Sequence, residues 1–243
     1  MQSDNDRLQD RVAFLEYELD QELIEELFFR LNEGVPLNPA EKRTRGEVLR
    51  GFINPLVRED DLFRCAGFRN VRKKYEDLLL RLLFMKSRGG HVHDVPDMKR
   101  TLIDDFASSF RPPLGEALSH EERAEYAGRL ADLVNEVGPT LDAMNTIFHP
   151  DDPLLRQQST FLIYFLVIEE LLRLGDPMPD RSRFEMFLDE LGSLRGKEEE
   201  ALTSDQREAL DYVAPLRETT TGSYTQEKAL IHLRYLRGDL RIV

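Results

Sequence analysis

Arginine and asparagine side chains are concentrated between residues 30 and 45, around a turn that contains glycine and proline. Guanidinium groups present a fork of donors that matches phosphate oxygens, and an amide both donates and accepts hydrogen bonds. A helix predicted to start near residue 39 adds unpaired backbone amides that suit an anion. The candidate phosphate- or nucleotide-binding residues are Arg30, Asn32, Glu41, Arg43 and Arg45.

The same spacing also has a purely structural interpretation. Arg30 and Asn32 occupy the last turn of a predicted helix beside Gly34, where their side chains could bond to the terminal backbone carbonyls. Spacing and residue type alone slightly favour this elbow between two helices over a phosphate site. Both interpretations stay open at the level of the sequence.

Two histidines, His91 and His93, stand with Asp94 and Asp97 in the only local group of metal-ligand residue types. They lie in a stretch rich in glycine and proline rather than on a helix face. The stretch that begins at His93 also matches the short His-x-x-Pro element of some His-Asn-His nucleases, in which only two positions are fixed. The sequence favours an exposed loop here, with a metal or nuclease site at His91 and His93 as a weak alternative.

Other residues with chemical potential are explained by composition. Adjacent carboxylates are expected in a chain with 46 acidic residues, and the pair Glu169 and Glu170 is predicted to face solvent at a helix boundary. Cys65 is the single cysteine, so an internal disulfide is excluded and inert packing is expected.

The formal net charge of −13 argues against a chain that wraps nucleic acid along its whole length. The charge is uneven, however, because 13 Lys and Arg stand against 6 Asp and Glu between Lys42 and Arg88. This basic segment could contact DNA phosphates, or it could pair with the acidic helices of the same chain. Internal pairing is the favoured interpretation.

The N-terminal residues are polar and acidic, without the basic start and apolar stretch of a secretion signal. No apolar run reaches the roughly 20 residues needed to span a bilayer. We therefore expect a cytoplasmic protein that does not enter membranes.

Hydrophobic spacing and capping signals predict a mainly α protein, a multi-helix globular bundle. Asn38 with Glu41, and Ser119 with Glu122, form the pattern of a capping box at a helix start. The first of these helices is expected to end near residue 54, before Pro55. The further predicted helices cover 71–86, 97–110, 120–137, 139–148, 154–174, 180–194, 205–213 and 225–237.

The first forty residues are ambiguous. Residues 12–19 partly alternate, which suits a short orphan strand, whereas apolar residues from 8 to 31 also fall at helical spacing, which is slightly favoured. A second strand is considered for 240–243. The predicted organisation is a helical segment 1–88 that carries the polar turn, a linker 89–96 and a C-terminal helical bundle 97–243, an arrangement also compatible with one packed domain.

The run from Phe28 through Gly34 to Glu41 resembles the Phe-x-Arg-x-Asn-x-Gly-x-x-Leu-x-x-x-Glu motif of GmrSD-type antiphage restriction proteins. Weaker similarity continues in the helix that contains residues 75–79, in the apolar helix from 157 and in residues 219–237. The resemblance covers most of the chain, and its first motif is the specific part. It implies a motif-supporting structural role for Phe28 and Gly34.

The resemblance also implies a partner. Members of that family carry a ParB/sulfiredoxin-like nucleotide-hydrolysing domain, marked by Asp-Gly-Gln-Gln-Arg, upstream of this motif, and many carry a His-Asn-His nuclease domain. That signature is absent from this chain. We therefore expect a module that is not active as this chain alone. It would need no cofactor of its own, and a nucleotide-binding or nuclease partner domain or subunit would bring NTP and a divalent metal.

Two other classes of function stay open. One is a metal-dependent nuclease or phosphohydrolase that uses His91 and His93. The other is a helical scaffold that binds DNA or protein through the basic segment between Lys42 and Arg88.

Overall fold

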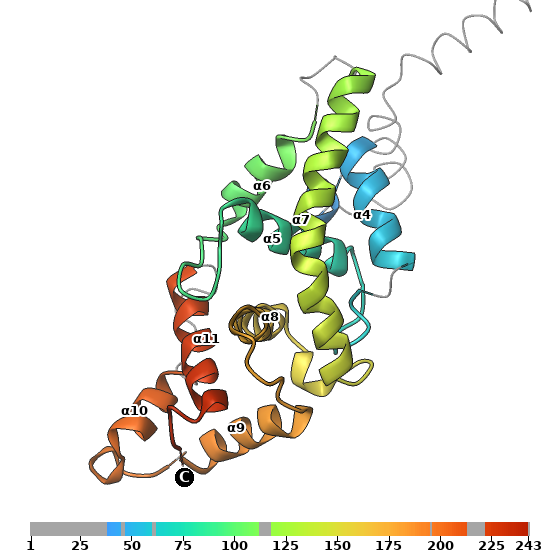
Figure 1. Cartoon of the computed structure of the whole chain (residues 1–243). Helices are drawn as coiled ribbons and strands as arrows, with labels where there is room; N and C mark the ends of the chain where they lie inside the picture. Colours follow the sequence, from blue (N-terminus) through green and yellow to red (C-terminus); the bar gives the residue numbers. More distant parts are fainter. Residues whose placement is uncertain are drawn as a thin grey trace, which may run out of the picture.

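The computed structural model describes residues 38–44, 47–59, 62–111, 118–194, 196–212 and 222–242, and these are mainly helical, without a named strand (Figure 1). The mainly α prediction is confirmed. The helices are α3 (Pro39–Arg43), α4 (Glu47–Glu59), α5 (Lys74–Ser87), α6 (Arg100–Ser108), α7 (His120–Ile147), α8 (Gln158–Leu174), α9 (Arg181–Leu194), α10 (Ser204–Asp211) and α11 (Gly222–Arg237), with the short 3-10 turns η1 (Pro153–Leu155) and η2 (Glu199–Ala201).

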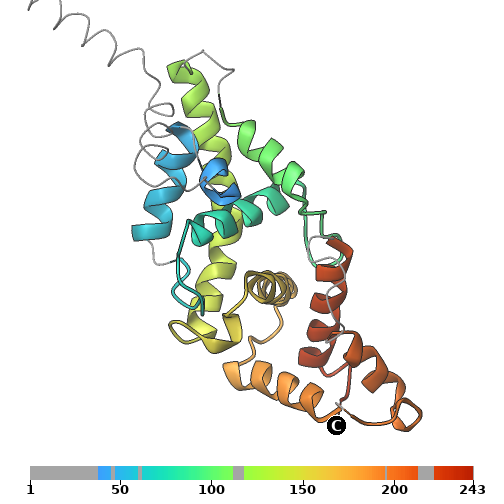
Figure 2. The same cartoon turned by 180° about the vertical axis from the view of Figure 1, so that it is seen from behind.

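The helices form an elongated bundle, with α8 crossing its middle (Figures 1 and 2). The long α7 runs beside α4 and α5, and α3 and α6 pack on α5. In the other half, α8 contacts both α7 and α11, while α9 and α10 complete the far end. Helix α8 therefore joins the two halves.

The centre of α8 is the best-predicted part of the core. Residues 161–168 are all buried, which accords with the apolar run in the sequence. Cys65 is also fully buried, and burial raises the pKa of its thiol to about 12, so the thiol is unreactive near neutral pH. One hydrophobic cluster includes side chains from both sides of residues 89–96.

Both predicted capping boxes are present. The Asn38 side chain accepts from the Glu41 amide at 2.8 Å and the Glu41 carboxylate accepts from the Asn38 amide at 2.7 Å. Ser119 and Glu122 make the same reciprocal pair at the start of α7. Each box satisfies two amides that a helix start leaves without intrahelical partners.

The predicted breaks at two prolines were wrong. Pro55 lies inside α4, and α7 continues through Pro139 instead of dividing there. A proline inside a helix removes one backbone hydrogen bond and crowds the preceding turn. Both prolines are exposed, and in α7 the buried residues Val137 and Leu141 continue one apolar face across the proline. Burial of that face outweighs the local cost.

The predicted helix from residue 38 to about 54 was also wrong in its continuity, because α3 ends at Arg43 and α4 is a separate helix. The strand considered for 240–243 is absent from its described residues. There Arg241 donates its amide to Asp205, and Ile242 accepts from the Gln206 side chain at 2.9 Å, so the tail bonds to the start of α10. The question of a strand or helix over residues 8–31 lies outside the described residues.

The start of α11 packs closely on the segment that joins α5 to α6. The Gly222 amide donates to the Asp97 carboxylate at 2.9 Å. A Cβ on Gly222 would lie 1.9 Å from the carbonyl oxygen of Val95. Glycine is therefore required here by close backbone approach.

We expect Gly222→Ala to lower the free energy of unfolding by about 1–3 kcal/mol, because the added methyl group must displace backbone. Urea denaturation followed by circular dichroism measures the change. Gly192→Ala is the control: its Cβ meets nothing within 4 Å, and alanine at this position of α9 should be neutral or stabilising by up to about 1 kcal/mol. Equal effects of the two substitutions would contradict the packing explanation.

His232 of α11 is fully buried among aromatic rings. Its ring stacks on Phe187, with centroids 4.1 Å apart, and meets Tyr164 edge-on at 5.0 Å. Among the residues that the structure describes, neither ring nitrogen has a hydrogen-bond partner. Burial lowers the pKa of His232 to about 3, so the imidazole is neutral in the folded protein at physiological pH.

Acidification should therefore destabilise the protein through His232. The unfolded chain protonates this histidine near its ordinary pKa of about 6.5, whereas the folded chain resists protonation down to about pH 3. Between these values the unfolded state binds more protons, so this residue lowers stability by up to about 1.4 kcal/mol for each unit that the pH falls. In denaturation from pH 7 to 4, wild type should lose stability relative to His232→Phe as the pH falls, and parallel curves would exclude this cause.

Candidate functional site

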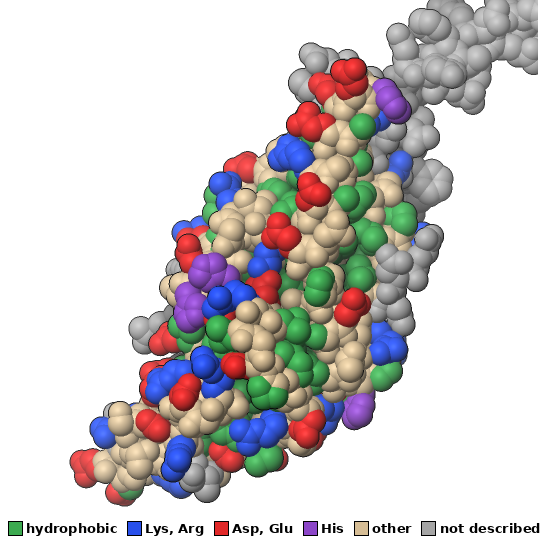
Figure 3. Space-filling model, viewed as in Figure 1, with side chains coloured by type: hydrophobic (Ala, Val, Ile, Leu, Met, Phe, Trp, Pro, Cys, Tyr) green, Lys and Arg blue, Asp and Glu red, His purple; other side chains and the backbone are tan. Residues whose placement is uncertain are grey.

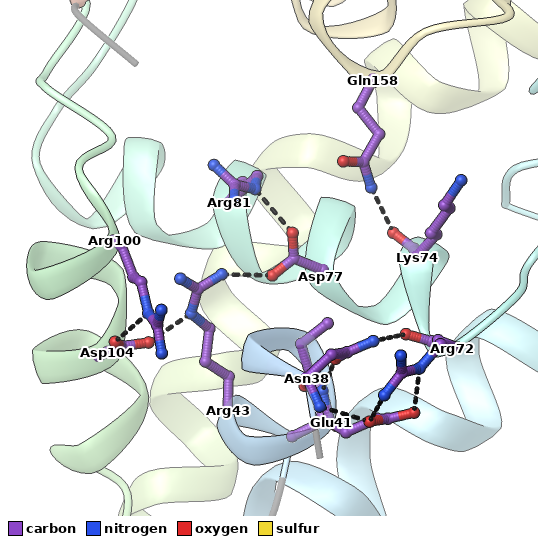
Figure 4. A network of polar contacts seen from close by, with 12 residues as sticks. Asn38, Glu41, Arg43, Arg72, Lys74, Asp77, Arg81, Arg100, Asp104 and Gln158 are labelled. Atoms are coloured by element: carbon purple, nitrogen blue, oxygen red, sulfur yellow. Dashed lines mark hydrogen bonds and ion pairs between the residues drawn. The ribbon is translucent and has the colours of Figure 1, made fainter. Parts of the chain in front are cut away.

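The end of the Phe-x-Arg-x-Asn motif is fixed on the start of α5. Its last residue, Glu41, completes the α3 capping box and also accepts two hydrogen bonds from the Arg72 guanidinium, at 3.1 and 3.2 Å (Figure 4). The Asn38 side chain donates to the Arg72 carbonyl at 3.2 Å. Burial acts in the opposite direction, but the hydrogen bonds from Arg72 and from the Asn38 amide hold the pKa of Glu41 below its ordinary value.

Arg43 ties α3 to two other helices through a buried ion-pair network (Figure 4). Its Nη1 donates to Asp77 of α5 at 2.6 Å, and its Nε donates to Asp104 of α6 at 2.5 Å. Asp77 also accepts from Arg81 at 2.8 Å, while Arg100 approaches Asp104 to 3.5 Å. The side chains of Arg43 and Asp77 are only 3% and 8% exposed, so this pair is internal, whereas Asp104 lies partly at the surface.

These positions bear directly on the phosphate-site candidates. Glu41 and Arg43 both make contacts within the protein, and the donors of Arg43 face carboxylates in the interior. The remaining candidates, Arg30, Asn32 and Arg45, lie outside the described residues together with Phe28 and Gly34. Of the five candidates, the described residues therefore include only Glu41 and Arg43, and both make contacts that hold the fold together.

Much of the positive charge between Lys42 and Arg88 is used inside the molecule. Besides Arg43, Arg81 pairs with Asp77 and Lys86 pairs with Glu169. Arg64 donates to the carbonyl oxygen of Asn145 at 2.7 Å. These contacts agree with the internal-pairing interpretation for this share of the segment.

A different share of that charge stands at the surface where α5 begins. Four of the six residues from 69 to 74 are basic, and we call these six residues the basic loop. Arg72 and Lys73 both adopt left-handed backbone conformations, with φ of 56° and 62°. Asn70 holds the turn, because its side chain accepts from the Tyr75 amide at 2.9 Å and donates to Glu76 at 2.9 Å.

Sequence reasoning treated the basic loop only as part of a longer basic segment. The signal that could have singled it out is the uninterrupted run Arg72-Lys73-Lys74 next to Asn70, a residue type that favours turns. The loop offers a group of cations on a backbone held by hydrogen bonds, and its six residues include no carboxylate, histidine, serine or cysteine. Such a group suits anion binding rather than bond breaking.

His91 and His93 lie at the surface, as predicted, with ring centroids 6.0 Å apart. Figure 3 shows neighbouring histidine side chains on the exposed face of the bundle. His93 Nε2 lies 3.4 Å from the Glu170 carboxylate, whereas Asp97 accepts from the Gly222 amide. Within the described ranges, no three or more His, Cys, Asp or Glu side chains come together as a metal site.

The expectation that Glu169 and Glu170 face solvent was wrong. Glu170 is buried and accepts two hydrogen bonds from Arg173, at 2.6 and 2.7 Å. These bonds hold the pKa of Glu170 below its ordinary value, whereas burial raises the pKa of Glu169, which pairs with Lys86. Glu169 thereby joins α8 to α5, whereas the pair of Glu170 and Arg173 lies within α8.

Comparison with known proteins gave no match to any family model, to any curated protein or to any solved structure. Among the helices that the structure describes, none is long and apolar enough to cross a membrane. The candidate site is therefore assigned from its own geometry.

We expect Arg43→Met to destabilise the protein by about 1.5–3 kcal/mol, because it removes a buried hydrogen bond from Asp77, which then keeps, among the described residues, only Arg81 as its cation. Arg100→Gln is the matched control: it removes a partner of the same Asp104, but the pair is exposed and should contribute less than about 1 kcal/mol. Urea denaturation of both variants measures the difference.

The double variant Arg43→Met/Asp77→Leu should regain part of the stability that Arg43→Met loses, since it removes the buried carboxylate that has lost one of its two cations. If Arg43→Met lowered the free energy of unfolding no more than Arg100→Gln does, the ion pairs of Arg43 could not be what holds α3 in place.

Proposed function

We propose that this chain is a helical module of a GmrSD-like antiphage restriction system, non-catalytic by itself. It completes a nucleotide or DNA phosphate site together with a nucleotide-binding or nuclease partner, either a separate subunit or another domain. The proposal starts from the motif between Phe28 and Glu41, which resembles the specific motif of that family.

The observation that carries the proposal is the anchoring of Glu41. This residue ends the motif, and it is bonded to both Asn38 and Arg72. Arg43, two residues on, bonds to α5 and α6. A site that must hold a phosphate needs a frame that does not move, and these contacts supply such a frame directly after the motif.

Side-chain chemistry separates the residues that bind phosphate from those that hold the fold together. The donors of Arg43 are engaged inside the protein, so Arg30 and Asn32 are the motif side chains that we assign to phosphate. Arginine binds phosphate oxygens in a bidentate fashion, and the asparagine amide adds one donor and one acceptor. NTP and a divalent metal would be bound chiefly by the partner.

The double substitution Arg30→Ala/Asn32→Ala should reduce NTP hydrolysis by the assembled system about 100-fold, the usual scale for loss of preorganised donors to a phosphate or oxyanion. The assay compares the purified chain alone, the chain with the products of neighbouring genes, and the assembled variant. Rapid hydrolysis by the isolated chain would overturn the proposal.

Two control variants sharpen this result. Arg207→Ala removes an exposed arginine from α10 and should leave hydrolysis unchanged. His91→Ala/His93→Ala should also leave NTP hydrolysis and DNA cleavage unchanged. Loss of cleavage in that second variant, with metal bound to the wild-type chain alone, would favour a metal-dependent nuclease instead.

A further inference from the structure

Three of the four cations of the basic loop, residues 69–74, stand at the surface outside the ion pairs of the described residues. Arg69 and Lys74 are exposed and Lys73 is half-buried. Among the ion pairs of the described part of the chain, none involves these three side chains. Like charges held this close repel one another, so an approaching polyanion lowers the energy of the loop.

The loop is also held in one shape before any partner arrives. Glu41 bonds the Arg72 guanidinium, and the Asn38 side chain bonds the Arg72 carbonyl. Gln158 of α8 donates to the Lys74 carbonyl at 2.9 Å, while the Lys74 amine points away from these contacts (Figure 4). A ligand that meets a preorganised loop loses less affinity to ordering of the chain.

Val71 places an apolar side chain among these cations. It is 55% exposed, more than any other large hydrophobic side chain in the part of the chain that the structure describes. Its neighbours in the sequence are Asn70 and Arg72, so the apolar surface is surrounded by polar and charged groups. Such an arrangement matches a nucleic-acid groove: the cations can contact the phosphates, while the valine contacts the sugars or base edges that lie between them.

The aromatic rings nearest the loop are already occupied. Phe68 and Tyr75 pack edge to face with centroids 5.5 Å apart, and the Tyr75 hydroxyl donates to the Phe68 carbonyl at 2.7 Å. Proteins that bind single strands generally stack bases on exposed aromatic faces. The basic loop offers cations and a valine instead, which favours a duplex.

From these observations we infer that the basic loop contacts the backbone of duplex DNA. Arg69, Lys73 and Lys74 bind phosphates, Val71 lies against the groove edge, and Glu41 positions Arg72 beside them. This inference deepens the proposed function and rests on its premise that the module meets phosphate. The net charge of −13 opposes tight binding, so the contact is strongly salt-dependent and works beside other contacts supplied by the partner.

The test is fluorescence anisotropy of a labelled 20-base-pair duplex titrated with the full chain at several salt concentrations. Arg69→Gln/Lys73→Gln/Lys74→Gln should weaken binding on the order of tenfold or more, and should make the slope of log affinity against log salt shallower by about 2–3. The matched control, Lys197→Gln/Arg207→Gln/Arg241→Gln, changes the net charge equally at exposed sites near the C-terminus and should retain the wild-type slope.

Two single substitutions test the roles of Val71 and Glu41. Val71→Ser should weaken binding severalfold without changing the salt slope, and unchanged affinity would remove Val71 from the interface. Glu41→Gln should lower affinity despite removing a negative charge, because Arg72 loses its support; higher affinity would overturn the positioning role.

Three outcomes would overturn the inference as a whole: no duplex binding by the wild-type chain at low salt, equal loss in the loop and control variants, or binding to anionic phospholipid vesicles without binding to DNA. These outcomes are independent of NTP hydrolysis. The inference can therefore fail while the assembled system still hydrolyses NTP, and rapid hydrolysis by the isolated chain would overturn the proposed function while leaving DNA binding intact.

Discussion

The Arg43 guanidinium lies among carboxylates from two other helices, and the arrangement around α3 depends on it. Helix α3 has only five residues, too few to be stable in isolation. Its position comes from Asp77 and Asp104, which bring α5 and α6 to the same point. A buried cation of this kind contributes geometry rather than a large net energy, since desolvation offsets much of the Coulomb attraction.

Around that point the chain divides its basic residues between two tasks. Arg43, Arg81 and Lys86 face inward and join helices, whereas Arg69, Lys73 and Lys74 stay at the surface. The difference lies in their partners: Arg43, Arg81 and Lys86 each form an ion pair with a carboxylate, whereas the three surface cations do not form one with a described residue. A chain with a strong overall acidic excess can in this way keep one locally positive surface.

Local signals in the sequence were sufficient for much of the fold. The capping boxes at Asn38 and Ser119 depend on residues three apart, and the core position of α8 depends on an unbroken apolar run, so both were predictable. The continuation of α7 through Pro139 was not, because burial against other helices compensates for a local defect.

The candidate site was less accessible to such reasoning, for a related reason. Asp77 and Asp104 are 34 and 61 residues from Arg43, and no local pattern announces that they meet. The same holds for Glu170, which lies 3.4 Å from His93, 77 residues away in the sequence, as well as beside the nearby Arg173. Residue types identified a polar region, but the three-dimensional partners decide which of its cations remain available to a ligand.

The hydrogen bond between Gly222 and Asp97 joins residues 125 positions apart and so closes a large loop of the chain. Closing such a loop has an entropic cost that grows with its length, and contacts of this range form late in folding. The last helix is thus accommodated on a segment synthesised long before it. Until α11 has been synthesised, the backbone of Val95 and Pro96 lacks the close packing partner that Gly222 provides.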